Sequence, residues 1–137
     1  MQILFDLSPL MTLSNQMGQA VSGVRQKAQS SLRSVTEETI THMKDVMPVL
    51  TGRAKSSWGR WTSHMVLANP EANEGDAILE DNSEADLSIT HGSAVPYMEL
   101  LNAGHSKKAP PGFVDMAAEI AADTLEAAVD RAVAEVL

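Results

Sequence analysis

The chain has 137 residues, no cysteine and a formal net charge of −8 at pH 7, as expected of one acidic domain spanning residues 1–137. Without cysteine it can form neither a disulfide framework nor a thiolate metal site. No stretch approaches the roughly 20 apolar residues of a membrane span, so we expect no membrane contact.

Charge is spread unevenly along the chain. Between Val21 and Arg60 seven basic residues face three acidic ones, whereas between Glu71 and Leu137 fourteen acidic residues face three basic ones. This asymmetry predicts head-to-tail contact between unlike faces of neighbouring copies. A solvated surface that keeps the chain soluble explains it equally well.

The first elements are a short strand and a long helix. Gln2 to Asp6 favours a strand, and Ser8 followed by Pro9 is typical of a helix start. Apolar residues then recur at spacings of three and four up to Met47, which predicts a helix from Pro9 to Val46. Gly18 and Gly23 leave a break in its early part open.

A corner follows the helix. Pro48 cannot donate a helix hydrogen bond, and Gly52 permits backbone angles that other residues resist. Beyond it, the sequence predicts an antiparallel meander with strands at Ser57–Ala68, Ala77–Glu80 and Ala85–His91.

The C-terminal part reads as a short helix, a loop and a long helix. Val95 to Leu101 predicts the short helix, and the Gly- and Pro-containing stretch from Asn102 to Gly112 predicts an exposed loop. The last helix begins near Phe113, with an apolar face of Phe113, Ala117, Ile120, Ala121, Leu125, Ala128, Ala132 and Val136. Together the elements predict an α+β fold in which a long N-terminal helix and a C-terminal helix pack on a small antiparallel β-sheet.

Motifs for chemistry are missing from the sequence. No two of the four histidines have the spacing of a zinc site, and no serine lies in a Gly-x-Ser-x-Gly elbow. Residues 51–55 lack the spacing of a phosphate loop, and the acidic residues at 80–86 lack that of a calcium-binding loop. Arg53, Lys55 and Arg60 near two tryptophans could contact nucleic acid, but the acidity of the remainder opposes phosphate. We therefore expect no enzyme, cofactor or metal site.

The order of features resembles a known family. A long helix ends in Pro-Val-x-Thr-Gly-x-x-x-x-Ser, a β meander follows, and then come a Tyr-x-Glu segment, a glycine loop and Pro-x-x-Phe-x-x-x-Ala. The matching residues are Pro48, Val49, Thr51, Gly52, Ser57, Tyr97, Glu99, Gly104, Pro110, Phe113 and Ala117. This arrangement is similar to the small tail-completion and neck proteins of tailed bacteriophages, the gene-ten-product-like family of head-to-tail joining proteins.

The resemblance implies a structural virion protein. Copies would form a ring, a hexamer or a dodecamer, between the portal-side connector or head-closure protein and the tail terminator or tail tube. The ring would be assembled in the host cytoplasm and would let double-stranded DNA pass without specific binding. Open alternatives are a tail terminator, a minor capsid protein, a small non-viral binding module, and a hydrolase with an unrecognised site.

Three groups of residues follow from this interpretation. The structural corner and subunit interface would use Pro48, Thr51, Gly52, Trp58 and Trp61. A partner-docking loop would use Gly104, His105, Lys107, Lys108, Pro110 and Phe113. Acidic residues facing the channel would be Glu80, Asp81, Glu84 and Asp86. If the corner acts through geometry alone, Gly52→Val should do more harm than Arg53→Ala.

Overall fold

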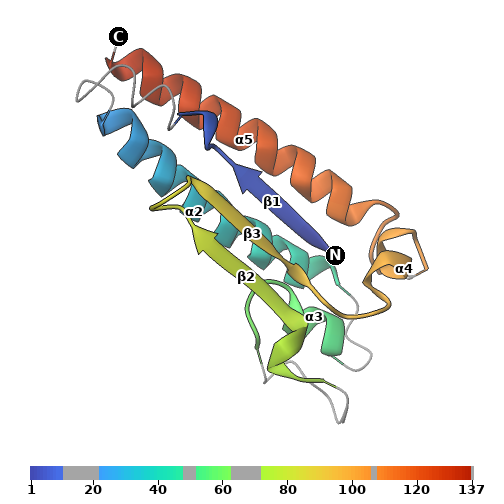
Figure 1. The fold of residues 1–137 in the computed structure, drawn as a ribbon. Coiled ribbons are helices and arrows are strands. Elements are labelled where there is room, and N and C mark those ends of the chain that lie inside the picture. The colour runs from blue at the N-terminus through green and yellow to red at the C-terminus, as the bar shows by residue number, and fades with distance from the viewer. Residues whose placement is uncertain (11–21, 48–51, 63–71, 106–107, 137) are drawn as a thin grey trace.

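The computed structural model describes residues 1–10, 22–47, 52–62, 72–105 and 108–136 (Figure 1). Its elements are β1 (Gln2–Asp6), α2 (Ser22–Val46), α3 (Arg53–Ser57), a 3-10 turn (Glu74–Asp76), β2 (Ala77–Asn82), β3 (Ser88–Ser93), α4 (Met98–Asn102) and α5 (Phe113–Val136). The fold is α+β, with α2 and α5 packed against a three-stranded antiparallel sheet.

The sheet has the strand order β1-β3-β2, so β3 is central. β2 and β3 form a hairpin, and β1 pairs with the other side of β3, with Ile3 opposite His91 and Phe5 opposite Ile89. The predicted strand at Gln2–Asp6 therefore has its predicted bounds, and it supplies the third strand of the sheet.

The expected strand at Ser57–Ala68 is wrong at its start. Arg53–Ser57 forms the short helix α3, and residues 58–62 have no regular structure, while residues 63–68 lie outside the described part. The apolar residues after the corner predict a strand, but Trp58 is buried in the core instead of pairing in a sheet. Tertiary packing overrides the local strand preference here.

Other boundaries shift by a few residues. The turn expected at residues 81–84 lies later, because β2 continues to Asn82 and β3 begins only at Ser88. The expected helix at Val95–Leu101 is α4, Met98–Asn102. Of the long helix expected from Pro9, α2 covers Ser22–Val46, and residues 11–21 lie outside the described part.

One face of the sheet is covered by the two long helices, which run antiparallel to each other (Figure 1). The core between them includes Phe5, Leu32, Met43, Ile89 and Leu125. α5 buries Phe113, Ala117, Ala121, Leu125 and Ala132 as predicted, but Ile120 is 61% exposed. Ile120 instead lines a surface groove together with side chains of α2 such as Thr39 and His42. Within the described part of the chain, none of the helices combines the length and the hydrophobicity of a transmembrane span.

Candidate functional site

The corner begins at Gly52, whose φ of 77° lies in the left-handed region that favours glycine. Its carbonyl oxygen accepts a hydrogen bond from the Ser56 amide at 2.9 Å, which opens α3. Pro48 and Thr51, the other residues predicted to shape this corner, lie outside the described part of the chain. The described residues thus show a left-handed turn at Gly52 that leads directly into α3, and the role of the corner in setting the angle between the long helix and the sheet stays a prediction.

An ion pair fastens the corner to the start of β2. Arg53 Nε donates to Asp76 Oδ2 at 2.9 Å, and Arg53 Nη2 donates to Asp76 Oδ1 at 3.2 Å. The two side chains are only 12% and 8% exposed. A bidentate pair in such a dry place is a strong constraint, and loss of one partner leaves a charge without compensation. This changes the expectation that Arg53 matters less than Gly52.

Trp58 and His91 form the buried centre of the corner. Both side chains are 0% exposed, and Trp58 Nε1 donates to His91 Nδ1 at 3.0 Å. Because Nδ1 accepts this bond, the neutral ring carries its proton on Nε2. Burial lowers the pKa of His91 to about 4, so the ring is neutral at physiological pH. The Phe5 ring packs against it edge-on, with centroids 5.0 Å apart.

Two serines complete this cluster without forming a catalytic arrangement. The Ser57 and Ser93 hydroxyls lie 2.7 Å apart, and both side chains are fully buried. His91 Nδ1 is engaged by Trp58, so it does not act as a base toward either serine. Within the described residues, no group of three or more His, Asp or Glu side chains could hold a metal ion. The contacts in this cluster join α3 to β3.

Lys44 secures the same segment from the side of α2. Its Nζ donates to the carbonyl oxygens of Lys55 at 3.0 Å and of Arg60 at 2.8 Å. Desolvation, together with the nearby charge of Lys55, lowers the pKa of Lys44 to about 8. Sequence alone does not indicate this role, because a basic residue such as Lys44 is ordinary near the end of a helix.

The two tryptophans predicted at a subunit interface differ in exposure. Trp58 is buried within its own chain, so it acts through the fold, whereas Trp61 is partly exposed. His91 and Asp76 were not singled out by the sequence. For His91 the strand alternation with Ile89 carries the signal, since both side chains are buried.

The predicted docking loop is anchored at both ends. Gly104 has a φ of 99° and packs closely on Pro111, while the buried Phe113 opens α5. The Gly112 amide donates to the Asn102 carbonyl oxygen at 2.5 Å. Between these anchors His105, Lys108 and Pro110 are exposed, and Lys107 lies outside the described part. The exposed residues thus project from a fixed base.

The acidic residues of the hairpin are exposed, but one is paired. Glu80, Asp81, Glu84 and Asp86 lie around the turn between β2 and β3. Asp81 lies 3.5 Å from the Arg33 guanidinium, and Arg33 Nε donates to Ser83 Oγ at 3.0 Å. The Ser83 hydrogen bond holds the pKa of Asp81 below its usual range. Arg25 also donates to the Glu84 carbonyl oxygen, at 2.6 Å.

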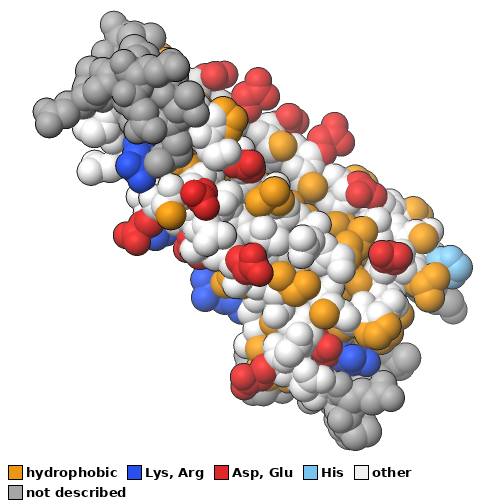
Figure 2. Space-filling view, viewed as in Figure 1, with side chains coloured by type: hydrophobic (Ala, Val, Ile, Leu, Met, Phe, Trp, Pro, Cys, Tyr) orange, Lys and Arg blue, Asp and Glu red, His pale blue; other side chains and the backbone are white. Residues whose placement is uncertain are grey.

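These contacts give the uneven charge of the sequence an internal role. Basic residues of the first half pair with acidic residues of the second half in Arg33–Asp81, Arg53–Asp76 and Lys27–Glu135. Much of the basic stretch expected to meet a neighbouring copy is thus used within the chain. The face seen in Figure 2 carries scattered acidic side chains with hydrophobic side chains between them.

Comparison with protein-family models, with curated proteins and with solved structures finds no match for this chain.

Proposed function

We propose that this chain is a structural protein of the neck of a tailed bacteriophage. In this proposal copies form a ring between the portal-side connector and the tail, and double-stranded DNA passes through it. The observation that carries the proposal is the agreement between the architecture implied by the resemblance and the observed one. Both have a long helix and a C-terminal helix on one small antiparallel sheet.

The positions of the resemblance residues support the same interpretation. Gly52 and Gly104 adopt left-handed backbone angles at turns, and Ser57 and Phe113 are buried. These residues stabilise the fold of the domain, so the contacts with other proteins would be made by other, exposed residues. A protein whose signature residues shape its fold suits an assembly role, in which surfaces meet other proteins.

Charge also supports a ring through which DNA slides. The net charge of −8 is repeated in every copy, so a lumen lined by such copies would repel phosphate rather than bind it. Glu80, Glu84 and Asp86 are exposed at the hairpin and are the residues that we propose face the channel. Asp81 is less suited to that role because its carboxylate faces Arg33.

Particle association tests the proposal. Phage particles made with and without the gene would be purified, analysed by mass spectrometry and labelled with antibodies against this chain. We expect label at the junction of head and tail, and filled heads without tails when the gene is deleted. Absence of the chain from complete particles would overturn the proposal.

The channel placement has a separate test. The combined variant Glu80→Ser, Glu84→Ser and Asp86→Ser should assemble unchanged but alter the rate of DNA ejection. Glu119→Ser with Asp123→Ser, which removes two exposed acids of α5 by the same substitution, is the control. Ejection that responds to neither set would refute the channel placement while leaving the neck role standing.

A further inference from the structure

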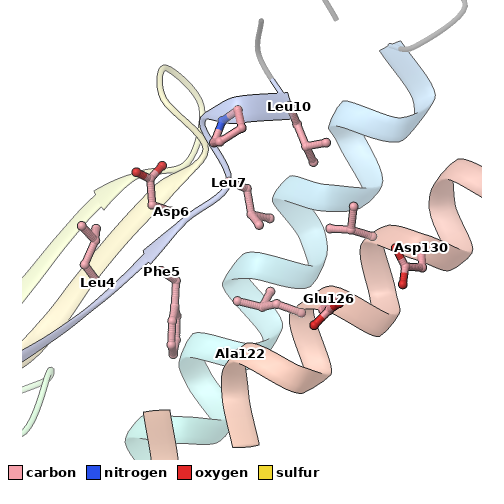
Figure 3. A pocket seen from close by; sticks show the side chains of 11 residues that line it. Leu4, Phe5, Asp6, Leu7, Leu10, Ala122, Glu126 and Asp130 are labelled. Carbon is pink, nitrogen blue, oxygen red and sulfur yellow. The ribbon is translucent and has the colours of Figure 1, made fainter. Parts of the chain in front are cut away.

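A groove runs between the outer edge of β1 and α5 (Figure 3). Its volume is about 490 Å³, which lies within the range of ligand-binding pockets in proteins. Its floor is apolar, with Phe5, Leu7, Leu10, Leu125 and Val129, and its rim is acidic, with Asp6, Glu126 and Asp130. Among the described residues that line the groove, none is basic.

The groove exists because the sheet is narrower than the helix layer. Two packed helices cover about 20 Å, since their axes lie about 8–10 Å apart, whereas three strands cover about 14 Å. α2 lies under β3, and α5 runs past the edge of β1 (Figure 1). The width of one strand is therefore missing above α5.

The edge of β1 offers the hydrogen bonds that such a strand needs. The N-terminal ammonium of Met1 and the Leu7 amide donate to the carbonyl oxygens of Ser93 and Leu87, so the odd-numbered residues of this segment direct their backbone groups to β3. By the alternation of an antiparallel ladder, Gln2, Leu4 and Asp6 direct theirs outward. In the described part of the chain no strand pairs with this edge.

We propose that this groove accepts an extended segment of another protein, which pairs with β1 as a fourth strand and alternates apolar with basic side chains. Apolar side chains on the inner face would cover Leu125 and Val129, and basic ones would meet the acidic rim. The length of β1 allows about five to seven paired residues. This proposal goes beyond the neck role and does not depend on it.

Charge selects another protein over a second copy of this chain. None of β1, β2 and β3 contains a lysine or an arginine, so no described strand of a copy matches the acidic rim. Two copies joined edge to edge through β1 would also bring their acidic rims together, and like charges at close range oppose association.

The first experiment measures binding of two synthetic peptides to the whole chain by calorimetry. One is acetyl-Lys-Val-Lys-Val-Lys-Val-Lys-amide, and its matched control has glutamate in place of lysine. We expect the lysine peptide to bind at least 10-fold more tightly, with an advantage that shrinks at high salt. Equal binding of both peptides, or binding of neither, would overturn the proposal.

Substitutions then locate the binding surface. Ala122→Trp fills the groove from an exposed position of α5, while Ala127→Trp changes an exposed position outside the lining. We expect the first to weaken binding at least 10-fold and the second to leave it unchanged. Equal effects of the two variants would place the peptide elsewhere and overturn the proposal.

A further pair of variants tests whether the peptide pairs with the backbone of β1. Leu4→Pro removes an amide that points outward, which an edge strand tolerates, and Leu4→Ala keeps that amide. Loss of binding only in the proline variant supports strand pairing. Retained binding in a folded proline variant would overturn it. The proposal would also be overturned if the wild-type chain formed a dimer and the proline variant were monomeric, because the occupant of the groove would then be a second copy. Uptake of an apolar dye without peptide binding would point to a small apolar molecule instead.

Discussion

The corner and the outer edge of β1 differ in how their polar and apolar groups are arranged. At the corner most of the buried polar groups are paired, with Arg53 bound to Asp76 and Trp58 bound to His91 Nδ1, while Ser56 Oγ and His91 Nε2 are buried without a hydrogen-bond partner among the described residues. At the edge of β1 the lining is apolar, the acids lie on the rim, and the outward backbone groups have no strand beside them in the described chain.

The difference separates stability from binding capacity. Buried pairs are costly to break, because each leaves a polar group that water cannot reach. An open apolar groove adds little to the stability of the isolated chain but has surface left to bury against a partner. Substitutions at the corner should therefore change the free energy of unfolding, and those at the groove should change association.

The largest loss is expected from Trp58→Ala. Removing a fully buried tryptophan costs about 3–5 kcal/mol, and His91 Nδ1 loses its donor as well. The free energy of unfolding should fall by at least about 4 kcal/mol in urea denaturation. A loss below about 1 kcal/mol would mean that the corner is not where stability is concentrated.

Arg53→Ala, also at the corner, should cost about 3 kcal/mol, because the Asp76 carboxylate loses its partner in a nearly dry place. Gly52→Val forces a β-branched residue into a left-handed conformation and should cost about 1–2 kcal/mol. Adding Asp76→Asn to Arg53→Ala should restore part of the loss. If Gly52→Val is the more harmful of the two, the corner depends on its backbone angle rather than on its ion pair.

The two regions also differ in how far the sequence predicts them. The strand at Gln2–Asp6 and the helix from Phe113 follow from local alternation and helix periodicity, and both begin where predicted. Arg53 and Asp76 are 23 residues apart in sequence, so no local pattern can join them. The groove is likewise a product of how far α5 extends past β1, which only packing decides.

Stability should fall between pH 6.5 and pH 4 because of His91. In the unfolded chain this histidine binds a proton near pH 6.5, whereas burial lowers its pKa in the folded chain to about 4. The unfolded state therefore binds more protons in this window, and the free energy of unfolding decreases as the pH falls, by up to about 3 kcal/mol. Urea denaturation at a series of pH values measures the slope. A folded His91→Gln variant should show a flatter one, and an equal slope in both would assign the effect to other groups.

The smallest effect is expected from Leu4→Ala, on the strand that borders the groove. Leu4 is 57% exposed on the outer face of the sheet, so its truncation should change the free energy of unfolding by less than about 0.5 kcal/mol. Its neighbour Phe5 points into the core and is 4% exposed, so Phe5→Ala should cost about 3–5 kcal/mol. The pair compares the two faces of one strand in a single urea experiment. A large loss for Leu4→Ala would mean that the outer face of β1 already packs against something within the chain, and the free edge would then contribute to the stability of the monomer rather than to binding.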